Sequence, residues 1–88
     1  MTYYGIGVDG DWLFNISQSP EGEAFMKRVR QMKGMVGVAD RWFHNYAVIL
    51  FTKRIEAECA RIRLSKEYRD RIYLLVVKAE GDEIKNDY

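Results

Sequence analysis

Cysteine, proline and histidine are almost missing from this chain of 88 residues, which has one of each. With Cys59 alone, the chain can form no intramolecular disulfide and no cysteine-rich metal site. No apolar run reaches the roughly 18 residues that a membrane-spanning helix needs. The first residues also lack the basic and apolar regions of a secretory signal. We therefore expect a protein of the reducing cytoplasm that makes no membrane contact.

The same scarcity argues against catalysis. Nucleophilic and zinc-dependent mechanisms need clustered histidine, cysteine and carboxylate side chains, whereas His44 and Cys59 fall on different predicted elements. Residues 5–10 match a Gly-x-Gly-x-x-Gly phosphate loop by letter. A hairpin is expected to follow them, however, so the helix N-terminus that binds phosphate is missing. We expect no enzyme activity, no cofactor and no metal.

The chain contains enough apolar residues to form one small hydrophobic core. Hydrophobic residues make up 48% and aromatic residues 14% of it, which is typical of a globular domain. A chain of this length forms a single domain that buries about 60% of its unfolded surface. We expect residues 1–79 to form that domain and residues 80–88 to form a polar, acidic tail that frays.

The N-terminal segment reads as a strand and a hairpin. Residues 3–8 alternate apolar and small side chains, which predicts a strand. Asp9-Gly10 favours a two-residue hairpin turn, and residues 12–16 alternate again. This pattern predicts a second strand that pairs with the first.

Two helices are expected further along the chain. Ser19 is typical of an N-cap and Pro20 of the first helical position, while Gly34 suits the left-handed residue that follows a helix. Thr52 can cap a second helix that ends near Tyr68.

Three further strands complete the pattern. Residues 35–43, 46–51 and 72–77 are rich in the apolar side chains that favour strands. His44-Asn45 is a candidate turn between the first two of them, since asparagine tolerates a positive φ.

The order of these elements resembles the ferredoxin-like split βαββαβ arrangement. The expected fold class is therefore α+β, with a four-stranded antiparallel sheet and two helices on one face. Right-handed crossovers place residues 3–8 and 46–51 side by side in the centre of the sheet. The hairpin over 12–16 would add an extra N-terminal strand.

The second face of this sheet needs a cover. Strands 46–51 and 72–77 are apolar on both faces, whereas a sheet with helices on one side should alternate apolar and polar residues. The candidates are residues 12–16, the acidic tail, a second copy of the chain or a foreign partner. The alternative is a central strand that is simply apolar on both sides.

The second helix also carries two apolar stripes on opposite sides. One stripe contains Ile55, Cys59 and Ile62, and the other contains Ala57, Ala60, Leu64 and Tyr68. One must face the core, and the other is covered by chain ends or forms an association surface. Alanine favours helices anyway, so we assign the association surface to Leu64 and Tyr68.

Charge is strongly segregated although the formal net charge is only +1. The first 26 residues contain four acidic and no basic side chains, and the last ten contain four acidic side chains and one lysine. The predicted basic patch lies on the helices and consists of Lys27, Arg28, Arg30, Lys33, Arg61, Arg63 and Lys66. Such a patch suits nucleic acid or an acidic protein, or it is a solvated face whose charges pair locally.

Aromatic and basic residues are densest between the two middle strands. This group contains Arg41, Trp42, Phe43, His44 and Tyr46, and it suits either base stacking or an interface anchor. Core packing is the ordinary alternative for such rings.

Residues 44–51 resemble the RNP1 strand of RNA-recognition motifs, whose aromatic side chains stack on bases. The match lies at Tyr46, Ala47, Ile49 and Phe51. It fails at the leading basic residue, at the glycine and at the second stacking ring, where Val48 stands. The resemblance implies RNA binding through Tyr46, with Tyr3 or Tyr4 as a companion ring.

Asp9-Gly10-Asp11 after a first strand resembles the metal-binding position of palm-type polymerases and GGDEF-type cyclases. Those enzymes take a second carboxylate from the middle hairpin, because two metals need several carboxylates. Residues 42–46 offer none, so the resemblance implies at most an inactive remnant.

Together these patterns predict a small non-enzymatic interaction or regulatory module. We expect it to bind a protein partner and to self-associate, with a dimer favoured. The alternative is a domain that binds RNA or single-stranded DNA through its aromatic sheet residues and basic helices.

Overall fold

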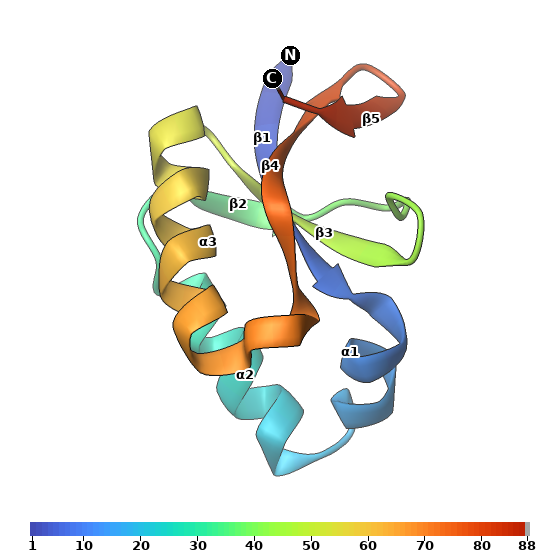
Figure 1. The fold of residues 1–88 in the computed structure, drawn as a ribbon, viewed down its shortest axis with the longest axis vertical. Helices are drawn as coiled ribbons and strands as arrows, with labels where there is room; N and C mark the ends of the chain where they lie inside the picture. The colour runs from blue at the N-terminus through green and yellow to red at the C-terminus, as the bar shows by residue number, and fades with distance from the viewer. Residues whose placement is uncertain (88) are drawn as a thin grey trace.

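The computed structural model describes residues 1–87, which form an α+β fold with three α-helices and a five-stranded antiparallel sheet (Figure 1). The elements are β1 (Thr2–Asp9), α1 (Gly10–Ile16), α2 (Pro20–Arg30), β2 (Met35–Val38), β3 (Tyr46–Phe51), α3 (Arg54–Tyr68), the 3-10 helix η1 (Arg69–Arg71), β4 (Ile72–Glu80) and β5 (Glu83–Asn86).

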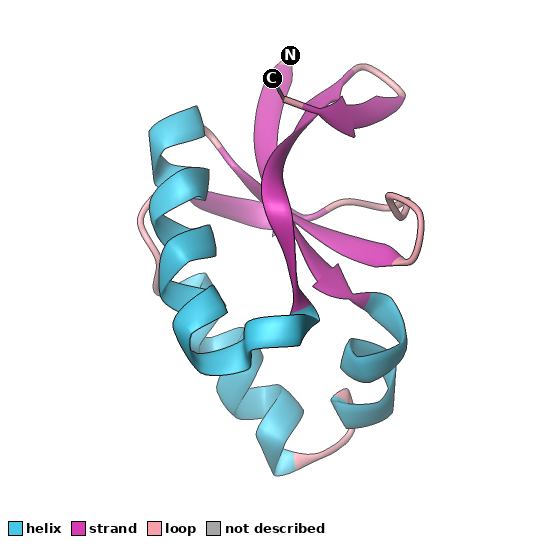
Figure 2. Cartoon of the chain, viewed as in Figure 1, coloured by secondary structure: helices cyan, strands magenta, loops and turns pink. Residues whose placement is uncertain are grey.

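The sheet has the strand order β2-β3-β1-β4-β5, and every neighbouring pair is antiparallel. As predicted, the strands over 3–8 and 46–51 lie side by side, with Ile6 opposite Ile49 in the register. Helices α1 and α2 lie at the end of the sheet away from the β4–β5 hairpin (Figure 2).

The fifth strand lies in the segment where we expected a frayed tail. In β5, Ile84 pairs with Ala79 of β4, and the N–H of Asp87 still donates to the carbonyl oxygen of Val76 at 3.1 Å. The expectation of fraying was therefore wrong for Glu83–Asn86. The edge of β4 supplies the backbone partners that the short polar segment could not provide for itself.

The predicted N-terminal hairpin is also wrong, because residues 10–16 form helix α1. The carboxylate of Asp9 accepts a hydrogen bond from the backbone N–H of Trp12 at 3.2 Å and so caps the helix. Trp12 and Ile16, four residues apart, turn toward the protein, while Phe14 is 75% exposed. Asp9-Gly10, a pair that favours turns, forms the start of a helix in this protein.

Helix α2 begins as predicted. The hydroxyl of Ser19 accepts a hydrogen bond from the backbone N–H of Gly22 at 3.3 Å, and Pro20 is the first helical residue. A Cβ atom at position 22 would overlap the carbonyl oxygen of Ile16. The close contact between α1 and α2 therefore requires glycine. Gly34 has the expected positive φ of 83°, although the helix already ends at Arg30.

The middle strands differ from the prediction at their edges. The strand expected over 35–43 ends at Val38, and Phe43 pairs with Tyr46 in an isolated bridge across the expected turn. The positive φ of this turn, 55°, falls on His44 and not on the asparagine.

Helix α3 ends at Tyr68 as predicted but has Lys53 as its N-cap instead of Thr52. The hydroxyl of Thr52 instead donates to the carboxylate of Glu56 at 2.7 Å.

The main core lies between the sheet and helices α2 and α3. It includes Ile6, Phe25, Ile49 and Leu64, all fully buried. A ring cluster closes one end of it: the ring centroids of Phe25 and Tyr68 lie 4.9 Å apart, and those of Trp12 and Phe25 lie 5.3 Å apart.

A second, smaller core covers the other face of the sheet. Val48 and Val77 are fully buried there beneath Phe43, with Tyr73 and Ile84 packed against them. The chain itself therefore supplies much of the cover that the sequence pattern demanded, from the loop before β3 and from β5.

Candidate interaction surface

Helix α3 is apolar on two opposite sides, and one of them packs into the core formed by residues 1–87. Ala57, Ala60 and Leu64 face the core. Ile55 is 66% exposed, Ile62 is 45% exposed, and Cys59 between them is also exposed. We call Ile55, Cys59 and Ile62 the outer stripe.

This arrangement reverses the assignment made from the sequence. Leu64 is 0% exposed, and Tyr68 is half-buried in the ring cluster with Phe25. Leu64 is therefore out of reach of a partner, the ring of Tyr68 packs against the core, and the exposed stripe is the one that the prediction had left for the core. Two alanines allow α3 to approach the sheet closely, so size alone was a misleading criterion.

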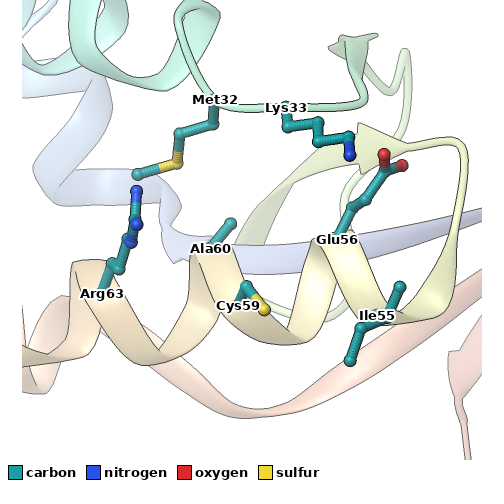
Figure 3. A pocket seen from close by; sticks show the side chains of 7 residues that line it. All are labelled: Met32, Lys33, Ile55, Glu56, Cys59, Ala60 and Arg63. Atoms are coloured by element: carbon teal, nitrogen blue, oxygen red, sulfur yellow. The ribbon is translucent and has the colours of Figure 1, made fainter.

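A groove of about 290 Å³ runs beside the outer stripe, between α3 and the connection after α2. Its lining is Met32, Lys33, Ile55, Glu56, Cys59, Ala60 and Arg63. In Figure 3 the side chains of Met32 and Lys33 point toward α3, Lys33 toward Glu56 and Met32 toward Arg63. The groove therefore combines an apolar floor with charges of both signs on its walls.

In the central part of α3, acidic residues precede Cys59 and basic residues follow it, while Arg54 begins the helix and Glu67 lies near its end. Glu56 and Glu58 lie in its first half, while Arg61, Arg63 and Lys66 lie in its second half. The Nε of Arg61 donates to the carboxylate of Glu58 at 2.8 Å. The carboxylate of Glu56 accepts from the backbone N–H of Lys53 at 3.2 Å.

A further ion pair joins the two helices of the main core. The guanidinium of Arg28 on α2 bonds the carboxylate of Glu67 on α3. This hydrogen bond lowers the pKa of Glu67 and raises the pKa of Arg28.

The predicted basic patch is divided rather than continuous. Arg28 and Arg61 are held in ion pairs. Lys27 and Arg30 line a second groove, of about 600 Å³, that lies between α1 and α2. The remaining members are Lys33 and Arg63, which line the first groove, and Lys66, which is exposed near the end of α3.

The predicted aromatic group is also divided. Phe43 is buried in the second core, and Tyr46 is half-buried with its ring centroid 4.9 Å from that of Tyr73. Trp42 remains 51% exposed, and His44 is exposed beside Phe43. Tyr73 was not among the predicted residues, because its contact with Tyr46 across β1 depends on the pairing of distant strands.

Arg41 connects the loop before β3 to the β4–β5 turn. Its guanidinium donates to the carbonyl oxygen of Asp82 at 2.6 Å, in the turn between β4 and β5. A groove of about 470 Å³ lies here, with Tyr3, Leu50 and Ile84 in its lining.

The Asp9-Gly10-Asp11 segment has a structural role. One carboxylate oxygen of Asp9 caps α1, and the other lies 3.4 Å from the guanidinium of Arg71. Within residues 1–87, no group of three or more histidine, cysteine, aspartate or glutamate side chains is arranged to hold a metal ion.

None of the helices in the described part of the chain has the length and apolar character needed to cross a membrane. No protein-family model matches the sequence, and no curated protein or solved structure matches it significantly.

Proposed function

We propose that this protein is a non-enzymatic interaction module that binds a protein partner through the outer stripe of α3. The supporting observation is that Ile55, Cys59 and Ile62 form an exposed apolar row on a helix whose opposite side is buried in the core. Burying this row against a partner is favoured, because each square ångström of apolar surface removed from water contributes about 25 cal/mol.

The position of the stripe on a rigid element supports this proposal. Helix α3 is held by Ala57, Ala60 and Leu64 against the sheet, and by the bond between Arg28 and Glu67 against α2. A surface fixed in this way loses little conformational freedom when a partner binds.

We further propose that the scaffold is ferredoxin-like, with β5 as an added edge strand. Strands β1 to β4 lie in the order β2-β3-β1-β4, and helices occupy the β1–β2 and β3–β4 connections. In such a scaffold the outer side of a helix is free to carry a partner while the sheet stays intact.

A photo-crosslinking amino acid at position 62 tests the interaction directly. We expect a discrete protein adduct from position 62 in cells that make the protein. The matched control is position 14, because Phe14 is also apolar and is 75% exposed, but lies on α1. If position 62 gives no adduct, or if both positions give the same adducts, the outer stripe is not the contact surface.

Nucleic-acid binding is the second candidate, and unpaired positive charge favours it. Lys27, Arg30, Lys33, Arg63 and Lys66 are exposed, and none of them forms an ion pair with another residue of the range 1–87. Labelled single-stranded RNA and DNA should be titrated at roughly 50 and 200 mM salt. Binding that falls steeply with salt would support this candidate, and no binding at the lower salt would exclude it.

A further inference from the structure

We infer that the partner of the outer stripe is a second copy of this chain, packed antiparallel along α3 with the twofold axis at Cys59. This inference rests on the proposed interaction function and names the partner. It follows from the order of the charges along α3, from the shape of the stripe and from the small side chain at its centre.

The charge order along α3 is complementary to itself in reverse. Two acidic residues, Glu56 and Glu58, precede Cys59, and two basic residues, Arg61 and Arg63, follow it. In a twofold contact, residue i of one copy meets residue j of the other, and j meets i. Around Cys59, an antiparallel pair therefore places acidic residues of one copy against basic residues of the other, whereas a parallel pair would align like charges. Arg54 and Glu67, at the two ends of the helix, are held in ion pairs with Asp87 and Arg28.

The positions of the charged residues around the axis of α3 are consistent with this pairing. Glu56 and Arg63 are seven residues apart, close to two full turns, so they lie on the same side of the stripe. Both line the groove beside α3. An antiparallel twofold contact brings this same side of both copies together. Glu56 of each copy then faces Arg63 of the other. Glu58 and Arg61 keep the ion pair that they form with each other within one chain.

The apolar residues fit the same arrangement. Ile55 and Ile62 lie on either side of Cys59 along the exposed row. Ile55 of one copy therefore meets Ile62 of the other. Packed helices have axes about 8–10 Å apart, and Cα atoms lie about 2.3 Å from the axis. The two Cys59 Cα atoms would then be about 3.4–5.4 Å apart, and the upper part of this range is a separation that a disulfide can bridge.

The contact is small, so the dimer should be weak. The stripe spans about two helical turns, roughly 11 Å, and a standard interface buries about 800 Å² on each partner. Met32 and Lys33, on the far wall of the groove, add surface to one side. We expect a dissociation constant of roughly 10–100 µM.

Charge reversal gives the sharper test, by sedimentation velocity across a concentration series. Glu56→Lys and Arg63→Glu should each weaken self-association about tenfold, because each places like charges across the axis. An equimolar mixture of these two variants should recover wild-type association, since every contact between the unlike chains is again between opposite charges. Circular dichroism of each variant checks that the fold is intact.

Cysteine crosslinking tests the antiparallel direction. Diamide, which takes two protons and two electrons from a pair of thiols, should crosslink the wild type through Cys59. In a Cys59→Ala background, Ile55→Cys alone and Ile62→Cys alone should stay monomeric on a non-reducing gel. A mixture of those two variants should crosslink.

Three results would overturn the inference: a wild-type protein that stays monomeric at all concentrations, charge variants that do not rescue each other, or self-crosslinking at positions 55 and 62. If the protein is monomeric yet position 62 photo-crosslinks to a different protein, the proposed interaction function stands, and the inference that the partner is a second copy of the chain is wrong. If position 62 gives no adduct of any kind, both proposals fail.

Discussion

The two sides of α3 carry similar apolar residues at similar spacing, yet one side is core and the other is surface. The core side consists of Ala57, Ala60 and Leu64, and the outer side of Ile55, Cys59 and Ile62. The outer side has two large aliphatic side chains, whereas the core side has one. The difference shows that the spacing of apolar residues predicts a helix but does not predict which of its faces packs against the core.

The reason lies in the distance between helix and sheet. Alanines at positions 57 and 60 are 0% and 3% exposed, so α3 lies close against the strands and has room for one large side chain, Leu64. A helix turned by half a rotation would have to fit two isoleucines in the same space. Interiors are packed as tightly as organic crystals, so the smaller stripe fits this gap better.

The largest effect should come from the core side. Leu64→Ala should lower the free energy of unfolding by about 2–5 kcal/mol, because it leaves a cavity in the core. Urea denaturation measures this change. Ile62→Ala on the same helix is the matched control and should cost far less. Equal costs for the two variants would mean that the two sides do not differ in burial.

Tyr68→Ala should have the next largest effect. Its ring packs against Phe25 and, at a centroid distance of 5.5 Å, against Trp12. We expect a loss of about 1–3 kcal/mol in unfolding free energy and a changed Trp12 fluorescence. Self-association of the folded variant should be unchanged. A selective loss of association would return Tyr68 to the surface role that the sequence suggested.

Ile62→Ser should separate the two sides most clearly. At a protein concentration low enough to give monomers, the unfolding free energy should change by less than about 0.5 kcal/mol, because the side chain is already in contact with water. The same substitution should reduce the fraction of dimer at high concentration. A large stability loss in the monomer would show that the outer stripe is packed inside the protein.

The smallest effect is expected from Glu67→Gln, which removes the negative charge from the bond between α3 and Arg28. The hydrogen bond from Arg28 holds the pKa of Glu67 below its ordinary value. Its stabilising contribution is therefore present above the ordinary pKa of about 4.3 and is lost as the pH falls through the lowered value. The exposed pair is screened by water.

Thermal unfolding over a series of pH values from 7 downward tests that direction, since the contribution is lost as the carboxylate becomes protonated. The wild type should be slightly more stable than Glu67→Gln at pH 7, and the two should converge in acid. A difference that grows in acid would contradict the lowered pKa.

Local chemistry explains what the sequence predicted correctly. The Ser19-Pro20 start of α2, the bounds of β3 and the end of α3 at Tyr68 each depend on neighbouring residues. The hairpin at Asp9-Gly10 was wrong because aspartate satisfies backbone N–H groups equally well in a turn and at a helix N-cap. The packing of Trp12 against Phe25 is a contact that favours the helix.

Tertiary contacts explain the rest. Strand β5 contains a single apolar residue, Ile84, and becomes a strand through its pairing with β4. The outer stripe was visible as a pattern, but its exposure depends on how α3 meets the sheet. Two alanines within one turn on one side of a helix were the available signal that this side approaches a neighbour closely.

The contact between α1 and α2 has an evolutionary consequence. Any side chain at position 22 would run into the carbonyl oxygen of Ile16, whereas a Cβ atom at Gly37 would meet nothing within 4 Å. Over evolutionary time, descendants that keep these two helices together must retain glycine at 22. Position 37 is free of that steric constraint and can drift.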